Sequence, residues 1–190
     1  MIAAITHESR NALQRSRAYL EELADLVRER TDAMELVTGT RRAIQQLQRL
    51  LEEVRAFAAP LKLESSVCDL PRIWRQVWSD LEPSLRGRDA QLREVNCGTD
   101  LRCDVDLFRV EQVFRNLFED ALSARPDPVR IDIECHEATI DGSPSLSIIV
   151  RDNGPGFSDD QLQKAFEPFF TTKPQVTGLG LAIVKRIFDA

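Results

Sequence analysis

The 190-residue sequence predicts two architectures in succession, an α-helical hairpin over residues 1–61 and an α/β sandwich over residues 62–190. Up to Phe57, apolar residues recur at the spacings of three and four that place them on one face of a helix. Pro60 then ends that pattern, because proline cannot continue a helical hydrogen-bond ladder. After Pro60, short β-like runs alternate with helical stretches, which predicts one mixed sheet covered by helices.

The hairpin is expected to consist of two helices of similar length, joined near Thr31. Asp32 followed by Glu35 resembles a capping box, so we expect these residues to start the second helix. The first helix carries one stripe of apolar or small side chains: Ile2, Ile5, Ser9, Ala12, Ser16, Leu20, Leu23 and Val27. The stripe of the second helix consists of Leu36, Ala43, Ile44, Leu47, Leu50, Leu51, Val54 and Phe57.

A hairpin of this kind cannot bury both stripes by itself. Pairing with a second copy would bury them in a four-helix bundle, so we expect a homodimer through residues 1–59. Gly39 is the weak point of this prediction, because glycine inside a helix costs roughly 1 kcal/mol relative to alanine.

The elements expected after Pro60 alternate in type along the chain. Strands are predicted over residues 67–70, 92–96, 101–105, 129–135 and 146–151. Helices are predicted over residues 71–85, 106–123, 158–166 and 179–190.

Composition argues against several classes of protein. The 31 acidic side chains outnumber the 25 basic ones and give a net charge of −6, which argues against nucleic-acid binding. No apolar run approaches the roughly 20 residues of a membrane-spanning helix, and the N-terminus lacks the features of a secretory signal. The four cysteines show no C-x-x-C spacing, so a reducing, cytoplasmic setting is the simplest interpretation.

Half of the eight glycines lie between Gly154 and Gly180. The segment Asp152-Asn153-Gly154-Pro155-Gly156 follows the most apolar predicted strand, and by itself it is more typical of a hairpin turn. Gly178 and Gly180 open a predicted helix, where backbone N–H groups can approach phosphate oxygens closely. They form neither a P-loop nor a dinucleotide fingerprint, since the further residues of both motifs are absent.

Asn116 and Asp120 lie four residues apart in the predicted helix 106–123, on a different face from its apolar side chains. Side chains directed at a metal ion or a phosphate would need such a placement. For an isolated pair, however, a solvated helix face is the favoured interpretation.

Four segments taken together resemble the catalytic domain of sensor histidine kinases. In chain order they are D-x-x-R-V-x-Q-V-x-x-N-L from Asp106, D-N-G-P-G-F, F-E-P-F-F-T-T-K and T-G-L-G-L-A-I-V-K. They are similar to the N, G1, F and G2 boxes of that family, in the family's order. Near the N-terminus, His7-Glu8-Ser9-Arg10-Asn11 resembles the H box in its H-E-x-R-N form.

The resemblance implies that residues 62–190 bind ATP and Mg²⁺. Asp152 would receive the adenine amino group, and Gly154 and Gly156 would let the chain turn tightly against the base. Asn116 and Asp120 would face Mg²⁺ and the phosphates. The remaining assignments implied by the family are a lid anchored by Phe166, Phe169 and Phe170, positive charge from Lys173, and a phosphate cradle formed by Gly178, Leu179 and Gly180.

The resemblance further implies that His7 accepts the phosphoryl group and passes it to an aspartate of a response-regulator receiver domain. On a wheel of 100° per residue, His7 lies about 160° from Ser9 and therefore points away from the apolar stripe. Neutral imidazole can attack a γ-phosphate at pH 7. By resemblance, Glu8 draws off the ring proton, and Asn11 orients a water for dephosphorylation of the partner.

Two departures from the family pattern bear on these expectations. Asp120 stands where the family usually has its magnesium-binding asparagine, so we expect activity with a stronger Mg²⁺ dependence. The chain ends at Ala190, directly after the predicted G2 helix, so we expect a catalytic domain without its last strands. Alternatives are a degenerate, non-catalytic dimeric docking module that binds nucleotide or a receiver domain, and a different ATPase of the same superfold.

Overall fold

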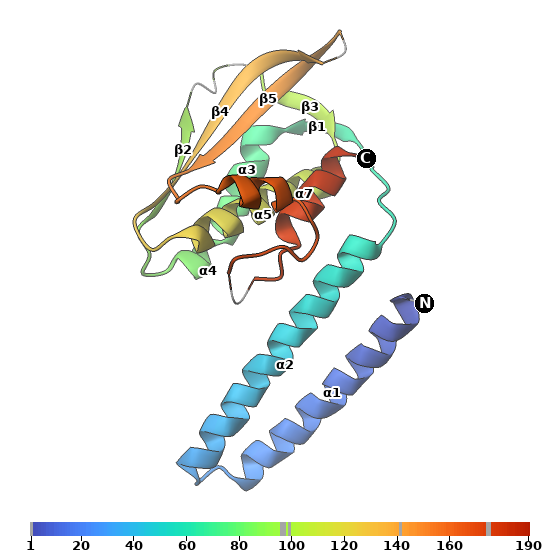
Figure 1. The fold of residues 1–190 in the computed structure, drawn as a ribbon, viewed down its shortest axis with the longest axis vertical. Coiled ribbons are helices and arrows are strands. Elements are labelled where there is room, and N and C mark those ends of the chain that lie inside the picture. Colours follow the sequence, from blue (N-terminus) through green and yellow to red (C-terminus); the bar gives the residue numbers. More distant parts are fainter. Residues whose placement is uncertain (1, 96–97, 99, 141, 174–175) are drawn as a thin grey trace. The chain divides into compact units, whose positions relative to one another are not determined.

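The computed structural model describes residues 2–95, 98, 100–140, 142–173 and 176–190, without the side chains of residues 2–8, 10, 49, 56 and 84. Two compact units make up the chain, residues 1–60 and residues 61–190. Figure 1 shows a helical hairpin in the first unit and strands interleaved with helices in the second. The predicted succession of a helical region and an α/β region is confirmed.

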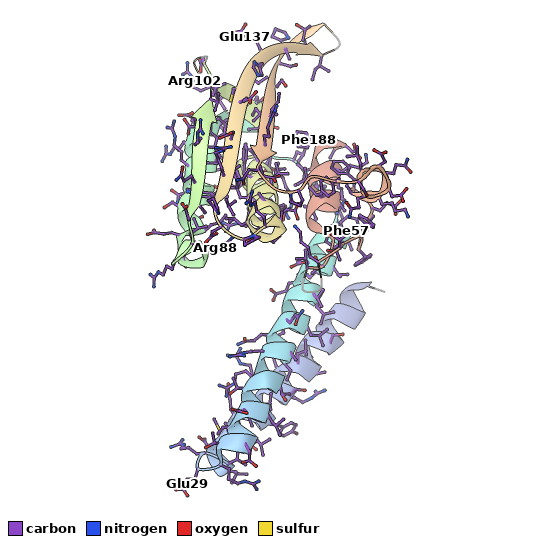
Figure 2. The ribbon with its side chains drawn as sticks, turned by 60° about the vertical axis from the view of Figure 1, so that its left-hand side comes forward. Glu29, Phe57, Arg88, Arg102, Glu137 and Phe188 are labelled. Carbon is purple, nitrogen blue, oxygen red and sulfur yellow. The ribbon has the colours of Figure 1, made fainter. Side chains whose placement is uncertain are left out.

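The first unit consists of α1 (Ile2–Leu26) and α2 (Thr31–Ala58), which run antiparallel along each other in Figure 1. The turn between them, where Figure 2 labels Glu29, is closed by the Arg30 N–H, which donates to the Val27 carbonyl at 2.8 Å. The last helical hydrogen bond of α2 runs from the Ala59 N–H to the Arg55 carbonyl at 3.0 Å, one residue before Pro60. Both predicted helices and the stop at Pro60 are therefore confirmed.

The predicted capping box at the start of α2 is wrong. The helix begins at Thr31, which places Asp32 inside its first turn, and no described side chain caps its N-terminus. Asp32 instead accepts a hydrogen bond from the Arg30 guanidinium at 3.1 Å, and this bond lowers the pKa of its carboxyl. A carboxylate in the first turn still favours the helix, because it faces the positive end of the helix dipole.

Several large apolar side chains of the hairpin are exposed in a single chain, among them Leu23, Leu36 and Leu47 of the predicted stripes. Leu13 and Val37 are buried between the helices. Five large apolar or aromatic side chains are exposed by 45% or more: Tyr19, Leu23, Leu26, Leu36 and Leu47. Such a run of exposed apolar side chains marks an interaction surface on a helical hairpin.

The second unit follows the predicted alternation of strands and helices. In chain order it contains β1 (Ser66–Asp69), α3 (Leu70–Asp80), α4 (Glu82–Leu85), β2 (Ala90–Val95), β3 (Arg102–Val105), α5 (Leu107–Ala124), β4 (Val129–Ile140), β5 (Ser143–Asp152), α6 (Asp159–Lys164) and α7 (Gly180–Phe188). The predicted helix 71–85 is divided at Leu81, because Pro83 has no N–H to continue the ladder.

The strands of the described residues form two sheets, so the prediction of one mixed sheet is wrong. One sheet has the order β2–β4–β5, with β2 parallel and β5 antiparallel to β4. The other consists of β1 and β3, paired antiparallel. Because β2 and β5 occupy both edges of β4, the short strand β3 pairs with β1 instead. Figure 2 shows Arg88 and Glu137 at opposite ends of the three-stranded sheet.

The core of the second unit lies between the inner face of β4 and the helices α3 and α5. Val129, Ile131 and Ile133 alternate along β4 and are 0–1% exposed. Phe114 of α5 contacts Trp74 edge-on at 5.6 Å between ring centroids, and Phe118 contacts Trp78 at 5.7 Å. The Trp74 indole donates to Glu94 at 2.8 Å, so its one polar atom is satisfied inside the core.

Asp106 fixes the start of α5. One carboxylate oxygen accepts from the Arg109 N–H at 3.0 Å as the N-cap, and the other accepts from the Glu64 N–H at 2.8 Å. These two donors lower the pKa of the Asp106 carboxyl, with the Glu64 N–H as the larger cause. The cap therefore holds α5 to the segment before β1 as well as starting the helix.

Phe118→Ala should destabilise the second unit strongly, because Phe118 is 0% exposed and its ring fills the space between α5 and α3. We expect a loss of about 3–5 kcal/mol in the free energy of unfolding. Urea unfolding followed by tryptophan fluorescence measures this loss, since Trp74 and Trp78 are the only tryptophans of the chain. The matched control is Phe108→Ala on the same helix, because Phe108 is 66% exposed. Equal losses for the two variants would contradict this account of the core.

Candidate functional site

One face of α5 lies against three separate parts of the second half of the chain. Asn116, Asp120 and Ala124 are spaced by four residues and therefore follow one another along this face. Asn116 lies beside Gly180, Asp120 pairs with Lys173, and Ala124 lies beside Gly154. The predicted pair Asn116 and Asp120 is thus part of a structured face that packs against three glycine- and lysine-containing segments, which excludes a solvated helix face.

The side chain of Asn116, a residue of α5, lies beside the N-terminal end of α7. A methyl group built on Gly180 would stand 3.8 Å from the Asn116 Cβ, which is ordinary van der Waals contact. The Asn116 Nδ2 is buried and has no hydrogen-bond partner among the described residues. A buried amide donor of this kind costs free energy unless another group accepts its hydrogen bonds. This atom therefore points to a ligand or water with an acceptor oxygen.

The start of α7 supplies further donors to the same place. The first N–H groups of a helix have no partner inside the helix and carry the positive end of its dipole. Leu179 precedes α7 and is 0% exposed, so it anchors this end of the helix in the core. Its own N–H donates to the Thr177 hydroxyl at 3.2 Å. Gly178, Leu179 and Gly180 thus form a fixed approach to a helix N-terminus, a setting that suits an anion.

Asp152 ends β5 and organises the loop that follows. Its Oδ1 accepts from the Gly154 N–H at 2.7 Å, and a methyl group built on Gly154 would lie 2.5 Å from that oxygen. Only glycine therefore leaves the Asp152 carboxylate in this position. Gly156 has φ +74°, a conformation that glycine adopts without strain. Since α6 follows this loop, the alternative of a β-hairpin turn is excluded.

The residues that hold this loop in place were not predicted from the sequence. The Asn153 side chain accepts from the Arg130 N–H at 2.9 Å and donates to the Pro128 carbonyl at 3.2 Å. Arg125, just after α5, donates to the Asn153 carbonyl at 2.8 Å. The asparagine of an Asn-Gly pair could have been recognised as a turn residue. The arginine has no local signal, because its partner lies 28 residues away in the sequence.

Arg88 reinforces the same end of α5. Its guanidinium donates to the Leu122 carbonyl at 2.8 Å and to Asp127 at 3.0 Å. The first bond satisfies a carbonyl at the end of α5 that no helical N–H reaches. Arg88 therefore fixes the C-terminal turn of the helix next to the Asp152 loop.

A backbone hydrogen bond joins the segment with the predicted lid residues to the residues just before α7. The Phe169 N–H donates to the Gly178 carbonyl at 3.0 Å. Gly178 has φ +71°, and a methyl group built on it would lie 2.5 Å from the Phe170 carbonyl oxygen. The Phe166 and Phe169 rings are exposed, whereas Phe170 is half-buried. Residues 174 and 175 lie outside the described part of the chain.

Lys173 extends from this segment back to α5. Its ammonium donates to the Asp120 Oδ1 at 2.6 Å, to the Asp120 carbonyl at 3.0 Å and to the Ser123 hydroxyl at 2.8 Å. The structure thus brings together the predicted site residues Asp120 and Lys173, and it adds Ser123 to them.

Oxygen atoms of Asn116 and Asp120 are suitable ligands for a hard cation such as Mg²⁺. No group of three or more histidine, cysteine or acidic side chains that could hold a metal lies within the described residues. A magnesium ion at this site would therefore take most of its ligands from phosphate oxygens and water, as this ion commonly does.

The candidate phosphoacceptor lies in the other unit. His7 and Glu8 are part of α1, but their side chains fall outside the described atoms, so the predicted outward orientation of His7 stays a prediction. Asn11 is half-buried one helical turn further on. Within the part of the chain that the structure describes, no helix is long and apolar enough to cross a membrane.

Comparisons with known proteins all lead to histidine kinases. The family model described as "Histidine kinase-, DNA gyrase B-, and HSP90-like ATPase" matches residues 105–190. The sensor histidine kinase ZraS of Salmonella typhimurium is 30% identical over 189 residues, which are 100% of this chain and 40% of that protein. The chain thus spans about two fifths of the length of this relative.

Two solved structures are similar as well. The catalytic domain of histidine kinase ThkA is 30% identical and matches with a TM-score of 0.58, over 66% of this chain and 80% of that domain. Histidine kinase ThkA in complex with response regulator protein TrrA matches with a TM-score of 0.68 at 22% identity, over 98% of this chain and 53% of that one. The second likeness concerns the fold alone.

Gly178→Ala should disrupt the junction between the lid segment and α7. The added methyl group would overlap the Phe170 carbonyl, and alanine at φ +71° is strained in addition. We expect a loss of more than about 2 kcal/mol in unfolding free energy and faster amide exchange at Phe169.

Gly142→Ala is the matched control, because Gly142 has φ +79° and open space around it. It should cost only the backbone strain, about 1 kcal/mol. Unfolding experiments on both variants compare the two costs, and a Gly142 loss as large as the Gly178 loss would refute the steric argument.

Proposed function

The chain belongs to the family of sensor histidine kinases, and on this premise we propose that it is the ATP-dependent protein-histidine kinase core of a two-component system. Residues 1–61 form the dimerisation and phosphotransfer hairpin, and residues 62–190 form the catalytic ATP-binding domain. His7 takes the γ-phosphoryl group of ATP and passes it to an aspartate of a response-regulator receiver domain in the cytoplasm.

The observation that carries this proposal is the convergence along α5. A buried amide donor without a partner among the described residues, the Asn116 Nδ2, lies beside Gly180 at the N-terminus of α7. Triphosphate oxygens are acceptors that satisfy both the amide and the free helix N–H groups. The Asp152 loop lies at the other end of the same helix face, so a nucleotide bound along α5 would extend from one to the other.

At the base end, Asp152 selects adenine. Its Oδ1 is already engaged by the Gly154 N–H, which orients the carboxylate and leaves the second oxygen to accept from the adenine amino group. Guanine presents a carbonyl oxygen at that position, which a carboxylate repels. This difference favours ATP over GTP.

At the phosphate end, the residues fit a magnesium ion bound with the nucleotide. Asn116 and Asp120 would hold it through their side-chain oxygens. When bound, Mg²⁺ neutralises phosphate charge during transfer. The protein's own contribution is to position the phosphates through the α7 N-terminus, Gly178, Leu179 and Gly180, so that the γ-phosphate is held for in-line attack.

His7 performs the nucleophilic step. A lone pair of the neutral imidazole attacks the γ-phosphorus while the bond to the ADP oxygen breaks, and the proton of the other ring nitrogen passes to Glu8. Asn11, one turn further on, orients the water that hydrolyses the aspartyl phosphate of the partner.

The uncovered apolar side chains of the hairpin support the proposed homodimer. Tyr19, Leu23, Leu26, Leu36 and Leu47 are exposed in one chain, and a second hairpin would bury them in a four-helix bundle. Similarity to sensor histidine kinases along the whole chain does not favour the alternative of a degenerate docking module.

His7→Ala should abolish incorporation of phosphate from γ-labelled ATP, because no other side chain would replace the imidazole. In the unchanged chain, the label should be lost in acid and retained in base, as expected for phosphohistidine. His136→Ala is the matched control, since His136 is the only other histidine and lies exposed in β4. Label that persists in the His7 variant, or label that survives acid, would rule out His7 as the acceptor.

Asn11→Ala should separate the two activities. Labelling of His7 should be retained, whereas dephosphorylation of a phosphorylated receiver domain should slow by roughly tenfold or more, because the water loses its orienting amide. The decay of labelled receiver domain is measured with each variant. Gln14→Ala, an exposed position on the same helix, is the control and should leave this decay unchanged. A parallel loss of both activities would contradict this role of Asn11.

A further inference from the structure

The Lys173 ammonium makes more contacts with α5 than a simple ion pair with one carboxylate would. All three N–H donors of its ammonium group are used, one by the Asp120 carboxylate and two by the Asp120 carbonyl and the Ser123 hydroxyl. The Ser123 hydroxyl in turn donates to the same Asp120 carbonyl at 2.9 Å. The four groups form a closed network between α5 and the segment after Phe170.

This pair differs from another lysine ion pair of the second unit. Lys185 and Asp189 are four residues apart on one helix, with side chains 54% and 60% exposed. Lys173 and Asp120 are joined across 53 residues, and their side chains are 24% and 36% exposed. Lower exposure means weaker screening by water and salt, so the attraction between these two charges acts at greater strength.

The position of the pair connects it with the nucleotide site. Asp120 follows Asn116 by one helical turn, and Asn116 lies against the start of α7. Asn116 and Asp120 would hold a divalent cation that arrives with the phosphates, and Lys173 now occupies the Asp120 carboxylate. Two cations at one carboxylate repel each other, so the carboxylate cannot serve both equally.

We propose that Lys173 and the Mg²⁺–nucleotide complex exchange at Asp120. Lys173 neutralises Asp120 in the nucleotide-free protein and gives up the carboxylate when the ion arrives with its phosphates. The inference rests on the proposed ATP-binding function and makes Lys173 a positioning residue that sets the Mg²⁺ dependence of nucleotide binding. The chain can make this exchange because two of the three ammonium contacts, to the Asp120 carbonyl and Ser123, do not involve the carboxylate.

The exchange explains how an acidic side chain can stand beside a triphosphate. An unpaired carboxylate would repel phosphate charge when no ion is bound. With Lys173 at 2.6 Å, the pair is close to neutral and opposes nucleotide much less. When the ion binds, the carboxylate becomes a ligand and the released ammonium adds positive charge near the phosphates.

Equilibrium binding of a non-hydrolysable ATP analogue, measured over a series of Mg²⁺ concentrations, tests the exchange. Lys173→Met removes the competitor, so the Mg²⁺ concentration for half-maximal binding should fall about fivefold, which corresponds to ~1 kcal/mol. Asp120→Asn should raise that concentration. In the double variant, Lys173→Met should have no further effect, because the carboxylate for which it competes is gone.

Two further variants keep the result interpretable. Lys164→Met, an exposed lysine of α6, should leave the Mg²⁺ requirement unchanged, and Lys173→Arg should restore it toward that of the unchanged chain. An unchanged or raised Mg²⁺ requirement in Lys173→Met, or additive effects in the double variant, would overturn the exchange alone. An unchanged chain that binds no analogue at any Mg²⁺ concentration would overturn the proposed function and the exchange with it.

Discussion

The close contact between one face of α5 and three chain segments is the constraint on which the rest of the site depends. Asn116, Asp120 and Ala124 succeed one another at intervals of four residues and meet Gly180, Lys173 and Gly154 respectively. At Gly154 an added methyl group would lie 2.5 Å from the Asp152 carboxylate and 3.4 Å from Ala124, whereas at Gly180 it would make ordinary van der Waals contact with Asn116. The core fixes α5 from the other side, through Phe114 and Phe118, so the helix acts as a rigid support for the proposed nucleotide site.

The polar and charged groups along α5 differ in what they can bind. In the proposed function, the N-terminus of α7 and the Asn116 amide donate hydrogen bonds to phosphates, whereas Asp152 accepts one from the base. Asp120 carries a negative charge between them, and Lys173 offsets it. The proposal gives the two units separate tasks, since the proposed nucleotide site belongs to one and the proposed acceptor, His7, to the other. Phosphoryl transfer in such a chain depends on bringing them together for in-line attack.

Local patterns predicted most of the elements, and long-range contacts account for what they missed. Helical spacing identified both hairpin helices and α5, and glycine placement located the two turns beside α5. The division into two sheets escaped prediction, because alternation along β3 does not say whether β1 or β4 is its partner. Arg30 overrode the capping box predicted from Asp32 and Glu35. The Lys173–Asp120 pair could not be predicted from the sequence either, because its residues are 53 positions apart and meet only in the folded chain.

The most direct test of the central claim is a nuclear magnetic resonance titration of the chain with an adenine nucleotide. The claim is that phosphates bind where Asn116 meets the start of α7. It predicts that the side-chain amide of Asn116 and the backbone amide of Gly180 show the largest shifts, saturating together with the same affinity. Nucleotide binding that leaves both signals unmoved, with shifts confined to other parts of the second unit, would contradict the claim.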